Sequence, residues 1–188
     1  MSPTAFQNPP SDAALEKALR LRTALLDSEL ADQASIIGCT VSEIQQVAQK
    51  SPIPLPDEYL AFLQVMGRKA GRLFRGTSVF FPEPLDAVVA AEDIAGDTGE
   101  TLTLENRFFF AHHQGYQVFF FENHQPNVYC YVERNPDRIQ TLAESFLDWA
   151  WRAHEITLEL RIEGKRLFES RQQKREAMGL PREEYREI

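Results

Sequence analysis

The sequence predicts a fold that mixes α-helices with an antiparallel β-hairpin, and two kinds of pattern support this. Residues 108–111 and 117–121 are short runs of aromatic and small apolar residues around a polar insert, residues 112–116, that contains Gly115. Elsewhere, apolar residues recur at helical spacing behind residues that cap helices. The hairpin is the element around which the rest of the chain is expected to pack.

The two hairpin strands are expected to be central in their sheet. Side chains alternate between the faces of a strand, so Phe108 and Phe110 are expected on one face and Phe109 and Ala111 on the other. Because both faces are then apolar, both need cover from other elements.

Length and composition indicate one domain with extensions. A chain of 188 residues with 13 Phe can bury a sizeable core. The net charge of −8 argues against general binding to nucleic acids or anionic membranes, and leaves a basic partner open. We find no apolar run of about 18 residues and no secretory start, so we expect a cytoplasmic protein without a transmembrane helix.

The N-terminal part is expected to be helical. Ser11 can cap a helix that runs to about Asp32, with a buried stripe formed by Leu15, Leu19, Leu26 and Leu30. Further on, Thr40 and Glu43 form a capping box, in which each side chain accepts a hydrogen bond from the other residue's backbone N–H. A short amphipathic helix is expected to follow this box.

A second buried helix is expected from Pro56, which suits a first helical turn. Its apolar residues fall at i, i+3, i+4 and i+7, and they are Tyr59, Phe62, Leu63 and Met66. Gly67 is expected to end this helix in a left-handed conformation.

The middle of the chain changes charge abruptly. Residues 68–75 hold four bases and no acid, but they lack the G-K-[ST] ending of a phosphate-binding loop, so a solvated loop is favoured. Residues 76–106 hold seven acids and no base. Within them we expect a strand at 77–81 and a helix at 84–95 whose inward residues are Leu85, Val88, Val89 and Ile94.

The C-terminal part begins with a strand at 128–133 and a turn at 135–137. Residues 141–144 match a second capping box, which is expected to open a helix with Leu142, Phe146, Trp149 and Ala153 on one side. Residues 154–164 fit both a strand alternation and a continuing helical stripe through Ile156, Leu160 and Leu167. One long helix is favoured, continuing into a charged helix at 165–178.

Five motifs, in this order, resemble the SUKH superfamily, the group around the yeast cell-wall-synthesis regulator and many bacterial toxin-immunity proteins. They are G-x-[ST]-x-x-E-I, L-P-x-x-[YF]-x-x-F-L, a segment with F-F-P, a hairpin with H-Q-G-Y-Q, and S-F-x-x-[WF]; here they occupy residues 38–44, 55–63, 75–82, 109–121 and 145–149. Met66 before Gly67 departs from the Asn-Gly that the family often has.

The resemblance covers roughly residues 36–153. It implies an α+β fold, with a mostly antiparallel central sheet and flanking helices. Residues 1–35 would then be an N-terminal extension and residues 154–188 a charged, helical C-terminal one. The resemblance also implies a protein-binding role without a family-wide catalytic residue or cofactor, so we expect no enzyme and no cofactor.

Two groups of residues invite a chemical interpretation. His112, His113, Glu122 and His124 could hold zinc, but no H-E-x-x-H or C-x-x-C spacing occurs, so loop histidines are favoured and no metal is expected. Cys39 and Cys130 are expected to be buried thiols rather than a disulfide or nucleophiles.

The candidate partner-binding residues lie in the acidic segment and the hairpin loop. They are Glu83, Asp86, Glu92, Asp93, Asp97, Glu100, His113, Gln114 and Tyr116. Carboxylates on one face would complement a basic protein and speed its encounter. The alternatives are a solvated acidic helix and a purely structural loop, in which Gly115 supplies a positive φ and Tyr116 returns to the core.

The first functional hypothesis is therefore an immunity protein that binds a basic toxin domain, for instance a nuclease, without contacting nucleic acid or membrane itself. The second is a regulatory or scaffold module in which residues 154–178 contact another chain. The sequence does not define the oligomeric state.

Overall fold

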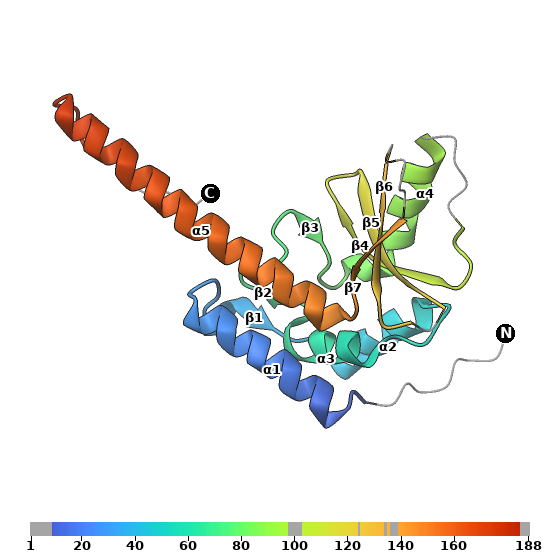
Figure 1. The fold of residues 1–188 in the computed structure, drawn as a ribbon. Coiled ribbons are helices and arrows are strands. Elements are labelled where there is room, and N and C mark those ends of the chain that lie inside the picture. The colour runs from blue at the N-terminus through green and yellow to red at the C-terminus, as the bar shows by residue number, and fades with distance from the viewer. Residues whose placement is uncertain (1–8, 98–102, 124, 134, 136–138, 185–188) are drawn as a thin grey trace.

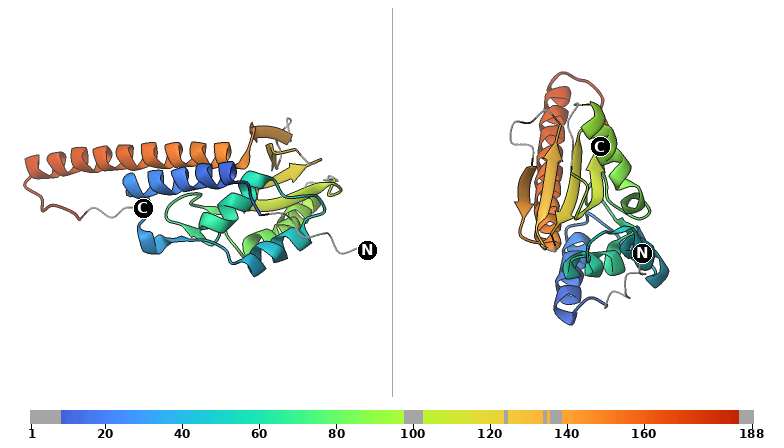
Figure 2. Two further views of the ribbon diagram at one scale, coloured as in Figure 1. Left: turned by 90° about the horizontal axis from the view of Figure 1, so that it is seen from below. Right: turned by 90° about the vertical axis from the view of Figure 1, so that its right-hand side faces the viewer.

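The structure is a computed structural model that describes residues 9–97, 103–123, 125–133, 135 and 139–184. Its larger sheet is antiparallel, in the order β3-β4-β5-β6-β7, and helices cover both of its faces (Figures 1 and 2). The strands are β3 (Thr77–Ser78), β4 (Arg107–His113), β5 (Gln117–Glu122), β6 (Val128–Val132) and β7 (Ile139–Ala143). This is the expected α+β fold.

Five α-helices and a two-stranded sheet complete the described residues. The helices are α1 (Asp12–Asp27), α2 (Val41–Lys50), α3 (Asp57–Met66), α4 (Ala87–Asp97) and α5 (Phe146–Ala177). The small sheet pairs β1 (Ile36–Ile37) with β2 (Lys69–Ala70), and short 3-10 turns η1 (Gln33–Ser35) and η2 (Glu83–Leu85) precede β1 and α4. None of these helices is long and apolar enough to span a membrane.

The β4–β5 hairpin confirms the prediction of a central, buried ribbon. It lies between β3 and β6, and Phe108–Ala111 and Val118–Phe121 are all buried. The alternation predicted for Ala111 was wrong, because the register shifts by one residue between Phe109 and Ala111. A bulge of this kind places two successive residues on similar sides of the strand. Ala111 therefore joins Phe108 and Phe110 in the main core.

The two faces of the sheet bury separate cores. The main core lies between the sheet and helices α1, α2, α3 and α5, and its centre is aromatic: the rings of Tyr59 and Phe146 are 4.9 Å apart, and those of Phe110 and Phe121 are 4.4 Å apart. The second core lies under α4, where Ala87, Ala91 and Ile94 cover Phe109, Val118, Phe120 and Tyr131. Helices α4 and α5 thus cover opposite faces (Figure 2).

Helix α1 is shorter than predicted, and its buried stripe is shifted by one residue. It ends at Asp27, because Glu29 has a positive φ of 55° that a right-handed helix does not tolerate. The buried residues are Ala14, Ala18, Leu21 and Leu25, whereas Leu19 is 49% exposed. Two of these four buried residues are alanines, whose small side chains suit the close contact between α1 and α3.

Three predictions, for the end of α3, for α4 and for β3, also fail. Gly67 ends α3 with a φ of −68°, which is not left-handed; glycine is needed there because a Cβ would lie 2.6 Å from the Leu63 carbonyl oxygen. Helix α4 begins only at Ala87, after η2. A different set of its residues therefore faces the sheet than was predicted, and Val88 and Val89 are exposed. Strand β3 covers only Thr77–Ser78 of the predicted 77–81.

The capping box predicted at residues 141–144 is wrong. Thr141 is part of β7, paired with Tyr129 of β6, and it is Ser145 that caps α5 by accepting a hydrogen bond from the Asp148 backbone N–H at 3.3 Å. The capping box of Thr40 and Glu43 is confirmed.

Helix α5 is continuous from Phe146 to Ala177, so the prediction of one long helix through residues 154–164 is confirmed. The boundary expected near residue 153 falls inside this helix, and the division into a domain and extensions stays a prediction. The turn expected at 135–137 lies outside the described residues except for Asn135.

Candidate interaction surfaces

The acidic surface consists of four exposed carboxylates on η2, α4 and the residue between them: Glu83, Asp86, Glu92 and Asp93. Helix α4 turns its small buried residues toward the sheet and these carboxylates toward solvent. Within the described part of the chain, Asp86, Glu92 and Asp93 form no ion pair, and Glu83 lies 3.9 Å from His112 Nε2. The surface therefore presents concentrated negative charge. Glu100 lies outside the described residues, and the same holds for the side chain of Asp97.

The hairpin tip holds the other three predicted residues. His113 Nδ1 lies 2.8 Å from the Thr77 hydroxyl, which fixes the imidazole against β3. Gln114 is exposed, and Gly115 has the expected positive φ of 76°. Tyr116 does not return to the core: it is 39% exposed and meets the His113 ring edge-on. The tip is closed by a hydrogen bond from the Tyr116 N–H to the His113 carbonyl, which leaves the phenol outside.

Among the described residues, the predicted ones do not come together into one site. After the β4 bulge, His112 points toward Glu83 on the α4 side of the sheet, whereas His113 faces the α5 side. The acidic surface and the His113 side chain consequently lie on opposite faces of the sheet.

A third surface includes part of residues 154–178, the segment that the scaffold hypothesis predicted to contact another chain, but the groove that it forms with other parts of the chain was not predicted. A groove of about 920 Å³ separates α5 from the ends of the central strands. Its apolar lining includes Phe74, Phe119, Trp149, Ile156, Leu160 and Leu167. Every charged or titratable side chain among the described residues that line it is basic: Arg72, Arg75, His113, Arg152, Arg161 and Arg171. We call this feature the α5 groove.

Several contacts fix the α5 wall of this groove. Trp149 stacks on Phe74 with ring centroids 4.2 Å apart, and His154 Nε2 lies 3.2 Å from the hydroxyl of Ser28 at the end of α1. Arg161 pairs with Glu29 at 3.0 Å. Figures 1 and 2 show the consequence: α5 runs beside α1 and then extends beyond the rest of the fold.

The helical stripe through Ile156, Leu160 and Leu167 was visible in the sequence, but its partner surface was not. Arg72 to Thr77 and His113 to Phe119 reach the groove from distant parts of the chain. Leu160 and Leu167 remain 70% and 59% exposed, which is high for a stripe of large apolar side chains.

His112, His113 and Glu122 do not converge as a metal site would require. Glu122 pairs with Arg107 at 2.8 Å, at the opposite end of the hairpin from His112 and His113. His124 lies outside the described residues, and the described ones contain no group of three side chains placed to hold a metal.

Both cysteines are buried free thiols, as expected. Burial raises the pKa of each thiol to about 12, so the reactive thiolate is strongly disfavoured near neutral pH. Neither has the environment of a nucleophile.

Comparison with known protein families identifies the family to which the chain belongs. A model of the SMI1 / KNR4 family (SUKH-1) matches residues 38–150, which is more than half of the chain and contains α2 to the first turn of α5. No curated protein matches the sequence. The family match agrees with the order of the motifs and with the α+β fold, and the chain therefore belongs to the SMI1 / KNR4 family (SUKH-1).

Proposed function

We propose that this chain is an immunity protein that neutralises a toxin by binding it, and that the acidic surface faces the toxin. The observation that carries the proposal is the acidic surface itself: Glu83, Asp86, Glu92 and Asp93 are exposed on η2, α4 and the residue between them, on a module of a family of immunity and regulatory domains. Such a face complements the basic cleft with which a nuclease holds phosphates.

Neutralisation would be steric and electrostatic, without turnover. The buried thiols and the separated histidines support a binding role over a catalytic one. Exposed charges at the rim of an interface mainly speed association, so ionic strength should act chiefly on the association rate.

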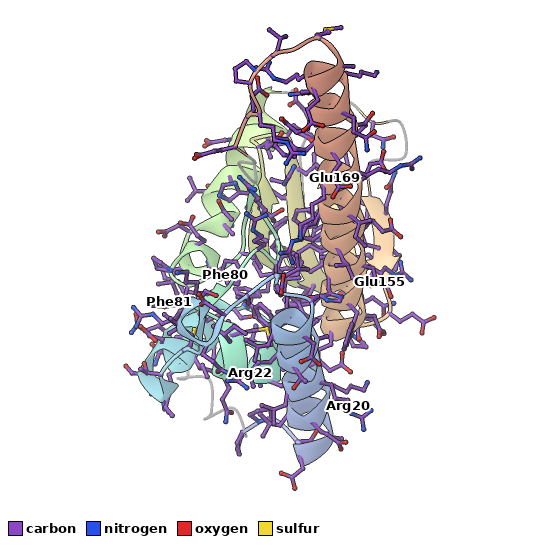
Figure 3. All side chains as sticks on the ribbon, turned by 90° about the vertical axis from the view of Figure 1, so that its left-hand side faces the viewer. Arg20, Arg22, Phe80, Phe81, Glu155 and Glu169 are labelled. Atoms are coloured by element: carbon purple, nitrogen blue, oxygen red, sulfur yellow. The ribbon has the colours of Figure 1, made fainter. Side chains whose placement is uncertain are left out.

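The test uses the toxin domain encoded beside this chain. We expect a complex whose association rate falls as salt rises. The double variant Glu92→Lys/Asp93→Lys should associate at least tenfold more slowly at low salt. Glu155→Lys/Glu169→Lys makes the same change in net charge on exposed positions of α5 (Figure 3) and should associate like the wild type. Absence of a complex would overturn the proposal, and equal loss in both variants would overturn the role of the acidic surface.

The regulatory or scaffold alternative and the cytoplasmic location stay predictions. The family match accommodates both functions, and the acidic surface is what favours immunity.

A further inference from the structure

The α5 groove has the opposite charge to the rest of the molecule. The chain has a net charge of −8, yet all charged lining residues of the groove are basic. Arg161 is already paired with Glu29, and the Arg152 guanidinium donates to the Leu142 carbonyl, so Arg75 and Arg171, both exposed, carry most of the available charge. A ligand for this groove should combine apolar side chains with carboxylates.

The chain itself displays a surface of that chemistry. On α4, Val88 and Val89 are 37% and 50% exposed, and Glu92 and Asp93 follow one helical turn later. Residues four apart lie on the same side of a helix, so Val88 and Glu92 share one side, as do Val89 and Asp93. Within the described residues of α4 there is no base.

We propose that α4 of one copy of this chain docks in the α5 groove of a second copy. The valines would contact Ile156, Leu160 and Leu167, and the carboxylates would face Arg75 and Arg171. The contact is head-to-tail, because α4 and α5 cover opposite faces of the sheet and α4 cannot reach the groove of its own chain (Figure 2). A docked pair thus keeps one free groove, on one copy, and one free α4, on the other, and the assembly can grow.

The dimensions agree with this arrangement. Helix α4 has 11 residues and is about 16 Å long, and the open stripe from Ile156 to Arg171 spans about 22 Å at 1.5 Å per residue. A contact through one short helix buries less surface than the roughly 1,600 Å² of a standard interface. The association should therefore be reversible and depend on concentration and salt.

This inference goes beyond the proposed function and does not depend on it. It does assign the acidic surface two mutually exclusive uses, so a bound toxin and a docked second copy would compete for α4.

The test is sedimentation velocity of the full chain over a range of protein and salt concentrations. For the wild type we expect an average mass that rises above the monomer's 21.5 kDa with concentration and returns to it at high salt. Leu160→Glu, in the groove, and Glu92→Lys/Asp93→Lys, on α4, should each remain monomeric. Ile162→Glu is the matched control, because Ile162 is 60% exposed but lies about 200° around α5 from Leu160; it should associate like the wild type.

Mixing the two monomeric variants distinguishes head-to-tail docking from a symmetric dimer. The α4 variant keeps its groove and the groove variant keeps its α4, so an equimolar mixture should form a 1:1 dimer of about twice the monomer mass and nothing larger.

A wild type that is monomeric at all concentrations would overturn the proposal. A second outcome would also overturn the proposal: Leu160→Glu abolishes association, Glu92→Lys/Asp93→Lys does not, and mixing the two variants restores nothing. All substituted side chains are exposed, and unchanged circular dichroism verifies folding. Toxin binding, measured separately, can succeed or fail without changing this result.

Discussion

The carboxylate of Glu58 accepts a hydrogen bond from the backbone N–H of Leu147 at 3.2 Å, which joins the start of α3 to the start of α5. The same carboxylate forms an ion pair with Lys17 of α1. One side chain of the L-P-D-E-Y motif therefore holds three helices together at the point from which α5 extends along the groove.

Glu58→Gln should destabilise the fold at neutral pH but not in acid. Burial opposes ionisation of Glu58, yet the hydrogen bonds from Lys17, Ser145 and the Leu147 N–H outweigh it and lower the carboxyl pKa below its usual 4.5. A lowered folded-state pKa stabilises the fold above the unfolded-state value, and this stabilisation disappears as the pH falls through the folded-state value. We expect a loss of about 1–2 kcal/mol at pH 7 in urea denaturation.

At pH 3 the two proteins should differ by less than at pH 7, since the stabilisation by the ionised carboxylate is lost as the pH falls below the unfolded-state pKa and through the lowered folded-state pKa of Glu58. Glu159→Gln, at an exposed position of α5, serves as the control and should change little at either pH. A difference between Glu58→Gln and the wild type that is the same at pH 7 and pH 3 would refute this role of the carboxylate.

Tyr59→Phe should leave stability unchanged or raise it. The phenol of Tyr59 is fully buried among Phe110, Phe121 and Phe146, and its hydroxyl has no hydrogen-bond partner among the residues that the structure describes. An unpaired buried hydroxyl costs about 1–3 kcal/mol, and phenylalanine keeps the ring while removing it. Thermal unfolding of the two proteins measures the difference; a clear fall in the midpoint for Tyr59→Phe would reveal a bond that this hydroxyl makes.

Two glycines should respond in opposite directions to alanine. A Cβ at Gly38 would collide with the carbonyl oxygen of Gln64, so Gly38→Ala forces the segment before α2 away from α3 and should cost about 1–3 kcal/mol or more. A Cβ at Gly96, in α4, has open space around it, and Gly96→Ala should stabilise by about 0.5–1 kcal/mol through helix propensity. Chemical denaturation of both variants checks the pair, and a Gly38→Ala protein as stable as the wild type would show that the two segments can separate without cost.

The sequence predicted those features that depend on residues close together in the chain, and missed those that depend on pairing between distant segments. The aromatic runs predicted the hairpin because strand alternation and the Gly115 turn are local. The bulge at Phe110 depends on how β4 pairs with β5, and it reversed the side assigned to Ala111. Similarly, Thr141 and Glu144 have the spacing of a capping box, but pairing with β6 holds Thr141 in a strand.

The candidate surfaces show the same division. The charge of residues 83–93 could be read directly, and so could the stripe on α5, because each belongs to one segment. The α5 groove could not be predicted, since Phe74, Phe119 and Trp149 meet only when the loop after β2, the hairpin and α5 are assembled. The exposure of Val88 and Val89 depended on where α4 begins, which η2 decides.

The most direct test of the central claim, that this chain acts by binding, is a titration of the neighbouring toxin's activity with the purified protein. The account predicts that inhibition is complete at one equivalent, develops with the association rate, and leaves the toxin chemically unchanged and active again after separation. Inhibition by a small fraction of an equivalent that deepens with time, or full toxin activity at excess protein, would contradict it.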